Sequence, residues 1–91
     1  MPDVHLETAY FSGRVQGVGF RYAALQVARE FEVSGFVANL DDGRVLIEVE
    51  GSPGEAEAFI AAVRERMHGH IRAVERSSRV RAGQYSGFSI R

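Results

Sequence analysis

A nine-residue stretch, Gly13 to Arg21, contains the residue types that bind phosphate. It reads Gly-Arg-Val-Gln-Gly-Val-Gly-Phe-Arg, with three glycines within seven residues. Glycine allows the main chain to approach a ligand closely. A glycine-rich turn that leads into a helix points backbone N–H groups at a ligand beside the positive pole of the helix, and this combination binds anions. Arg21 adds a planar, permanently charged group that suits phosphate oxygens.

The same stretch can also be read as a plain turn between a strand and a helix. Glycine motifs taken alone give many false positives. The stretch matches neither G-x-x-x-x-G-K-[ST] nor G-x-G-x-x-G, and the chain contains no lysine. The spacing of these residues therefore leaves a phosphate cradle and a plain turn equally open.

A strand and a helix are predicted on the two sides of the glycine turn. Residues 4–12 alternate and include aromatic residues, which predicts a strand. From Phe20 the apolar residues recur at helical spacing, which predicts a helix of about three turns that ends before Ser34. The apolar residues of this helix, which we expect in the core, are Phe20, Ala23, Ala24, Val27, Ala28 and Phe31.

Two further strands are predicted to form a hairpin. Residues 35–40 read as the first of them, and the Asp-Gly pair at 42–43 indicates a tight turn. Residues 44–50 then alternate cleanly, so that Glu48 and Glu50 lie on one face. Two carboxylates on one face can form an acid–base pair, but we favour a solvated strand face.

The second helix has a clear predicted start. Ser52 suits the N-cap, Pro53 the first helical position and Glu55 the acidic position of a capping box. Two histidines close the helix, His68 and His70. Their spacing could serve a metal ion, but no third ligand is evident nearby, and we expect no metal site.

The chain is predicted to end with two more strands. Residues 71–82 form a polar, arginine-rich segment that suits an edge strand or a bulged one. Residues 87–91 predict a short final strand that adds to an edge. The order βαββαβ is a split βαβ pattern, so the predicted fold class is α+β, with two helices on one face of an antiparallel sheet. With no linker or repeat, residues 1–91 are expected to form a single domain.

Composition excludes several classes of function. A net charge of −1 disfavours sequence-independent binding of nucleic acid. The chain has no cysteine, which removes disulfides and thiolate chemistry, and no apolar run of the ~20 residues that a membrane span needs. The first residues carry neither the basic end nor the apolar run of a signal peptide. We therefore expect a cytoplasmic protein that does not bind membranes.

Two stretches of the chain resemble the signature motifs of the acylphosphatase family. The first is GRVQGVGFR, from Gly13 to Arg21. The second runs Gly35-Phe36-Val37-Ala38-Asn39 and continues with Gly43, Val45 and Gly51. Both fit without a gap, and the ferredoxin-like fold of that family agrees with the predicted element order. The resemblance extends over the whole chain, with one departure, since the residue after the asparagine is often Thr or Ser in relatives and is Leu40 here.

The resemblance implies a function and a set of site residues. It implies hydrolysis of the carboxyl–phosphate bond of a small acyl phosphate by direct in-line attack of water, with no cofactor, metal or covalent intermediate. Arg21 and Asn39 would be the catalytic residues, and Asn39 would hold the water. The phosphate would be bound by Arg21 and the loop N–H groups, from Arg14, Val15, Gln16, Gly17, Val18 and Gly19. Inorganic phosphate and sulfate would then bind as product-like ligands.

Two other kinds of function remain as alternatives. A non-catalytic module could bind an anionic metabolite through the same loop, but it would have no need of a water-holding Asn39. An RNA-binding domain would need exposed aromatic residues and a basic sheet face, whereas the third strand offers Glu48 and Glu50. We therefore expect an enzyme that acts as a monomer on a small molecule.

Overall fold

The computed structural model describes residues 2–91, which contain one five-stranded sheet in the order β4-β1-β3-β2-β5. The strands are β1 (Asp3–Gly13), β2 (Val33–Asn39), β3 (Val45–Gly51), β4 (Ile71–Ala82) and β5 (Phe88–Ile90). The pairs β1–β4, β1–β3 and β2–β3 are antiparallel, whereas β5 is parallel to β2. The sheet is therefore mixed: β1 to β4 are antiparallel as expected, and only the short edge strand β5 departs from that expectation. Because β4 runs opposite to β2 and the chain reverses after β4, β5 takes the direction of β2.

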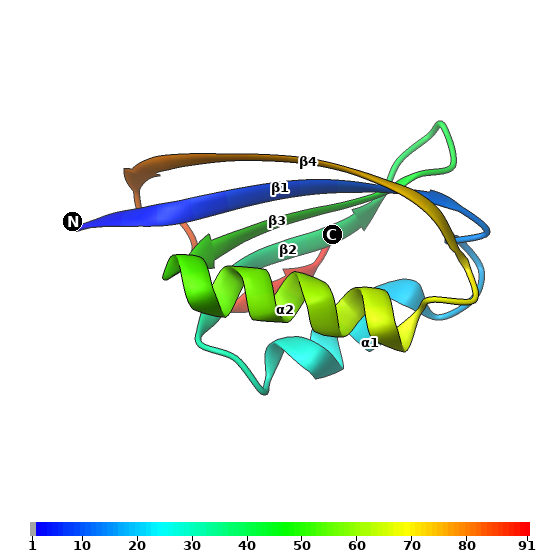
Figure 1. Ribbon diagram of the computed structural model, residues 1–91, viewed down its shortest axis with the longest axis horizontal. Helices are drawn as coiled ribbons and strands as arrows, with labels where there is room; N and C mark the ends of the chain where they lie inside the picture. The colour runs from blue at the N-terminus through cyan, green and yellow to red at the C-terminus, as the bar shows by residue number, and fades with distance from the viewer. Residues whose placement is uncertain (1) are drawn as a thin grey trace.

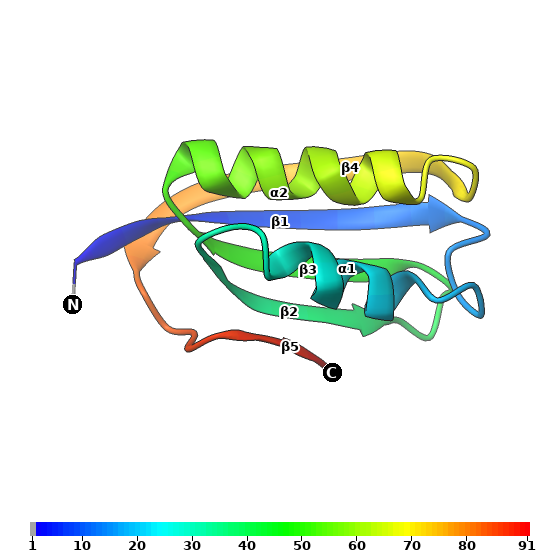
Figure 2. The same ribbon diagram turned by 90° about the horizontal axis from the view of Figure 1, so that it is seen from below.

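Both helices, α1 (Phe20–Ala28) and α2 (Pro53–Arg66), cover the same face of the sheet (Figures 1 and 2). The largest fully buried side chains between the two layers include Phe11, Phe20, Phe59, Ile47 and Ile60. The predicted α+β class and βαββαβ order are confirmed. The first helix ends at Ala28, earlier than the expected end just before Ser34, and a turn at residues 29–30 follows it. Phe31 nevertheless packs against the core, as its spacing predicted.

The start of α2 is as predicted, except for the role of Glu55. The Ser52 hydroxyl accepts a hydrogen bond from the Glu55 N–H at 3.3 Å, and Pro53 occupies the first helical position. The Glu55 carboxylate does not reach back to close a capping box. It accepts from the N–H of Glu32 at 2.8 Å. A tertiary partner thus replaces the local one and connects α2 to the segment that enters β2.

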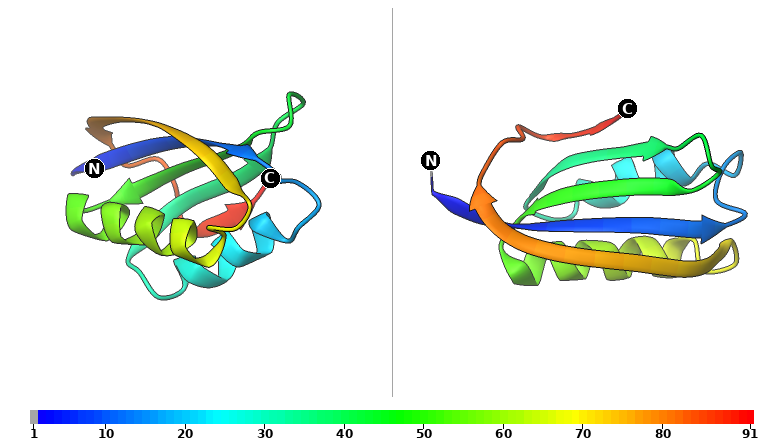
Figure 3. Two further views of the ribbon diagram at one scale, coloured as in Figure 1. Left: turned by 45° about the vertical axis from the view of Figure 1, so that its right-hand side comes forward. Right: turned by 90° about the horizontal axis from the view of Figure 1, so that it is seen from above.

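Glu48 and Glu50 do not form the solvated face that we expected. Glu50 is only 4% exposed and accepts from the N–H groups of Gln84 and Tyr85 at 2.8 to 3.0 Å. The Tyr85 hydroxyl donates to Glu48 at 2.8 Å. The segment from β4 to β5 runs past this end of the open sheet face (Figure 3). The alternation in β3 could not reveal that residues far along the chain would cover these carboxylates.

The glycine turn and the turn between β2 and β3 meet at one end of the sheet. The connection from β1 to α1 and the turn from β2 to β3 both lie beyond the same ends of the strands (Figures 2 and 3). As predicted, β4 is an edge strand, and its register with β1 shifts between Ser12 and Gly13, where the glycine turn begins. No helix within residues 2–91 is long and apolar enough to cross a membrane.

Candidate functional site

The N-terminus of α1 has no side-chain cap. Its N-cap residue is Gly19, which has left-handed backbone angles (φ 80°, ψ 19°) and no side chain that can accept a hydrogen bond. The first helical bond runs from the N–H of Ala23 to the carbonyl of Gly19 at 3.0 Å. The N–H groups of Phe20, Arg21 and Tyr22 therefore have no intrahelical acceptor. They point out of the positive end of the helix, where an anion is stabilised.

The glycine turn adds a second set of backbone donors. Gly17 also has a left-handed backbone (φ 75°), and a Cβ at Gly17 or Gly19 would meet no atom within 4 Å. The requirement for glycine at these two positions is therefore conformational rather than steric. Val15 is fully buried and anchors the turn in the core. The N–H of Arg14 donates to the carbonyl of His70 at 3.0 Å, so this predicted phosphate donor is already engaged.

Asn39 lies opposite the turn, as the last residue of β2. Its Oδ1 atom is buried and has no hydrogen-bond partner within residues 2–91. A buried acceptor without a partner destabilises a fold by about 1–3 kcal/mol, so such atoms are rare and call for an explanation. A ligand or a water molecule that donates to Oδ1 would satisfy it.

Arg21 and Asn39 line one small hollow, together with parts of the turn. Its volume is about 100 Å³, below the range of about 300–1,000 Å³ that is typical of pockets for whole small molecules. The Arg21 side chain is exposed, and no acidic group of residues 2–91 pairs with it. The described residues that line the hollow include no Ser, Thr, Cys, His, Asp or Glu: they are Val15, Gly17, Gly19, Phe20, Arg21, Tyr22 and Asn39.

Gln16 contacts the site in a way that the sequence did not predict. Its side-chain Nε2 donates to the carbonyl of Leu40 at 2.8 Å and to that of Arg44 at 3.0 Å. Gln16 was predicted to act through its backbone N–H, as part of the phosphate loop. In addition, its side chain connects the loop to the β2–β3 turn, and the role of its backbone N–H stays a prediction. No local pattern could have shown this connection, because the partners lie 24 and 28 residues away.

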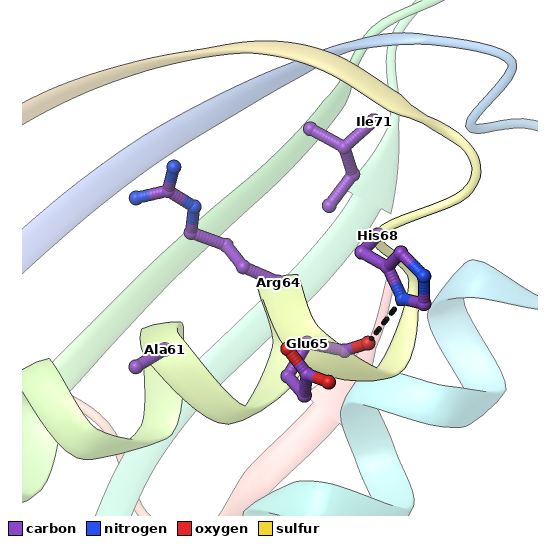
Figure 4. Close-up of a pocket in the computed structure, with 5 residues that line it drawn as sticks. All are labelled: Ala61, Arg64, Glu65, His68 and Ile71. Carbon is purple, nitrogen blue, oxygen red and sulfur yellow. Dashed lines mark hydrogen bonds between the residues drawn. The ribbon is translucent and has the colours of Figure 1, made fainter.

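A larger hollow lies elsewhere, beside the C-terminal half of α2, and has a volume of about 390 Å³. It is lined by Ala61, Arg64, Glu65, His68 and Ile71 (Figure 4). Arg64 points away from His68, whose Nδ1 donates to the carbonyl of Glu65 at 3.0 Å. The side chains of Arg64 and His68 are exposed and do not converge on a common point. Within residues 2–91, no three His, Cys, Asp or Glu side chains are grouped closely enough to hold a metal ion.

This ferredoxin-like α+β chain places an uncapped helix, a glycine turn and an arginine around one small hollow, and features of these kinds favour anions. Comparison with known proteins gives the family. The sequence profile described as Acylphosphatase matches residues 7–90. The chain therefore belongs to the acylphosphatase family.

Individual members of the family are similar to this chain over most of its length. A protein named acylphosphatase from a Roseiflexus species is 38% identical over 91 residues, which cover 99% of this chain and 98% of the relative. Another, from Methanospirillum hungatei, is 39% identical over 79 residues, or 87% and 85% of the two chains. The crystal structure of acylphosphatase from Bacillus subtilis superposes with a TM-score of 0.84 at 31% identity, covering 94% of this chain and 97% of that one.

Proposed function

We propose that this member of the acylphosphatase family hydrolyses the carboxyl–phosphate bond of an acyl phosphate by direct in-line attack of water. The water oxygen forms a bond to phosphorus as the bond from phosphorus to the acyl oxygen breaks. The products are a carboxylate and inorganic phosphate, and the proton released from water passes to solvent or to the phosphate. The described residues that line the hollow include no Ser, Thr, Cys, His, Asp or Glu, and the Tyr22 side chain is 69% exposed, which supports a direct displacement.

The chemistry of the leaving group explains how so sparse a site can be sufficient. Carboxyl groups have pKa values of about 4, so the carboxylate departs without a proton and needs no general acid. Phosphoryl transfer passes through a loose transition state in which the nucleophile is only weakly bonded, so a strong base matters less. The protein then has to hold the phosphoryl oxygens and align one water molecule.

Arg21 and the backbone donors would bind the phosphoryl group. The N–H groups at the start of α1 and in the glycine turn, from Val15 onward, would supply a set of fixed donors. The Arg21 guanidinium adds charge and a planar pair of donors. Because the Arg14 N–H donates to His70, we begin the proposed cradle after Arg14. The small hollow holds the phosphoryl end, and the acyl group would extend toward solvent beside Tyr22, which is 69% exposed.

Asn39 would hold the attacking water, and its unpartnered Oδ1 is the observation that carries this proposal. A carbonyl oxygen accepts hydrogen bonds and repels an anion, so Oδ1 suits a water molecule rather than a phosphate oxygen. A protein that only binds an anion would gain nothing from such an acceptor. The non-catalytic alternative is therefore not favoured, in agreement with the activity for which the relatives are named.

A monomer is the proposed state of the protein. The outer edge strand β4 carries four arginines along its length, and charges on an edge strand discourage pairing with another copy. Size-exclusion chromatography with light scattering measures the mass directly. The cytoplasmic location expected from the sequence also stays a prediction, which cell fractionation tests.

The experiment that tests the function is hydrolysis of benzoyl phosphate by the purified protein, with and without EDTA. We expect the same rate in both, because the proposed mechanism uses no metal. A simple alkyl phosphate ester is the control substrate and should react very slowly, since the described residues that line the hollow include no Asp, Glu or His to protonate an alkoxide leaving group. Activity that disappears with EDTA and returns with a divalent ion would contradict the mechanism.

A further inference from the structure

We propose that Gln16 is a positioning residue that fixes Asn39 relative to the phosphate cradle. This inference rests on the proposed function, in which the cradle holds the phosphoryl group and Asn39 holds the water. In-line attack requires a fixed distance and direction between these two parts of the site. The parts come from different segments of the chain, so some contact must set their relative position.

The side-chain amide of Gln16 makes that contact with both of its N–H groups. Nε2 donates to the carbonyl oxygens of Leu40 and Arg44, at 2.8 and 3.0 Å. Both acceptors are carbonyl oxygens, so the amide nitrogen and not the amide oxygen must face them. The orientation of the Gln16 amide is therefore fixed by chemistry, and its two donors are fully used.

The two acceptors are the residues that close the β2–β3 turn directly after Asn39. The Leu40 N–H donates to the Arg44 carbonyl at 2.8 Å, and the Gly43 N–H donates to the Leu40 carbonyl at 3.1 Å. Gln16 thus binds both ends of the turn. On its other side, Gln16 belongs to the proposed cradle through its backbone N–H and directly precedes Gly17. One side chain therefore connects the phosphate-binding loop to the end of the strand that carries Asn39.

Asn39 depends on this connection because no hydrogen bond within the described residues holds the Oδ1 end of its side chain. Its Oδ1 has no partner within residues 2–91, and the next residue, Leu40, has no hydroxyl group that could support it. The direction of the Asn39 side chain is therefore set by its backbone, which is paired with Val45 on one side and followed by the turn on the other. Without the two hydrogen bonds from Gln16, the β2–β3 turn and Asn39 would be free to move relative to the cradle.

A double-mutant cycle on the full chain tests the proposal, using Gln16→Ala, Asn39→Ala and the double variant. For each we would measure kcat, the inhibition constant of inorganic phosphate and the melting temperature. We expect Gln16→Ala to lower kcat by about 10- to 100-fold, the scale of a misplacement near 1 Å. Phosphate inhibition should change by less than ~3-fold, because the cradle itself remains. Gln26→Ala is the matched control, because the Gln26 side chain accepts a hydrogen bond from Arg66 of α2 away from the site. The kcat of this variant should be unchanged.

The double variant decides whether Gln16 acts through Asn39. We expect Gln16→Ala to lower kcat by less than ~3-fold further once Asn39 is already alanine, because residues that act as a unit are not additive. Effects that multiply would overturn the proposal and leave the proposed function intact. Wild-type kcat in the folded Asn39→Ala variant would instead contradict the water-holding role, and with it this inference.

The isosteric variant Gln16→Glu provides a second test that does not depend on loss of side-chain volume. Its carboxylate would face two carbonyl oxygens, whereas the protonated acid can donate a hydrogen bond to one of them. The kcat of this variant, divided by the wild-type kcat at each pH, should therefore rise as the pH falls toward about 5. A ratio that is independent of pH would contradict a donor role for residue 16.

Discussion

At the scale of single residues, Arg21 and Asn39 are proposed to act at different stages of one reaction. The exposed Arg21 guanidinium would bind the phosphoryl group both before and during the reaction. The buried Oδ1 of Asn39 would act only on the attacking water. An interaction made only in the transition state affects turnover without affecting ground-state binding. The two residues should therefore give different kinetic signatures when they are replaced.

Arg21→Ala should remove both turnover and phosphate binding. We expect kcat/KM to fall by about 1,000-fold or more, the upper scale for loss of one positioned donor, because Arg21 also supplies charge. Arg21→Lys should recover little, since an ammonium on a flexible chain does not reproduce the planar guanidinium. Steady-state kinetics with phosphate as inhibitor measures both effects. Arg29→Ala, which removes an exposed arginine at the other end of α1, is the control. An Arg21→Ala variant that still binds phosphate normally would refute this role.

Sequence reasoning at this scale is strongest where the residue type itself carries the chemistry. The glycines and Arg21 could be recognised because left-handed turns require glycine and phosphate favours arginine. It failed where the partner lies far along the chain. Neither the bond from the Arg14 N–H to His70 nor the two bonds from Gln16 leave a trace in local spacing.

At the scale of elements, the two helices begin in opposite ways. The start of α2 is closed by the Ser52 hydroxyl, which accepts from the backbone. The start of α1 follows Gly19 and is left open. An N-cap side chain and a bound anion compete for the same N–H groups. In this chain the sequence therefore marks the capped helix by its serine and the proposed anion-binding helix by its glycine.

The strand that carries Asn39 depends on Gly35. A Cβ at Gly35, which has φ +148°, would lie 1.9 Å from the Glu48 carbonyl oxygen on β3. Gly35→Ala should therefore lower the free energy of unfolding by about 3 kcal/mol or more, through overpacking together with backbone strain. Denaturant unfolding measures this change. Gly54→Ala in α2 is the matched control, because no atom lies within 4 Å of its added Cβ. It should be neutral or stabilising by up to ~1 kcal/mol. Equal stability of the two variants would contradict the close approach of β2 and β3.

At the scale of the whole molecule, the two faces of the sheet are covered by different means. The helices cover one face with an apolar core, whereas the segment from β4 to β5 covers one end of the other face through polar contacts. There Tyr85 packs edge-on against Phe36 and donates to Glu48, and Glu50 accepts from two backbone N–H groups. The order of helices and strands along the chain was predictable from the periodicity of its apolar residues. This covering was not, because it depends on the path of a loop with no periodic pattern.

Tyr85→Phe should reveal this covering through the pH dependence of stability. Burial, and then the hydrogen bond to Glu48, raise the pKa of Tyr85 above its usual value near 10. A raised pKa means that this stabilisation is complete below the unfolded pKa and is lost as the pH rises through the folded pKa. At neutral pH the variant should be less stable by about 1 kcal/mol, the contribution of one hydrogen bond. The difference should shrink above pH ~10.

Thermal melts from pH 7 to 11 measure the effect of Tyr85→Phe. The control is Tyr22→Phe, because Tyr22 is 69% exposed and should contribute little to stability. A gap between the wild type and Tyr85→Phe that stays constant through alkaline pH would contradict the raised pKa.

The central claim is that the hollow between the glycine turn and Asn39 binds the phosphoryl group. A titration of the isotope-labelled protein with inorganic phosphate, followed by NMR of its amide groups, tests this claim most directly. We predict saturable shifts in the backbone amides of residues 17–22 and in the side-chain amide of Asn39, with little change around the larger hollow beside α2. Shifts centred on Arg64 and His68, or no saturable shift in residues 17–22, would contradict it.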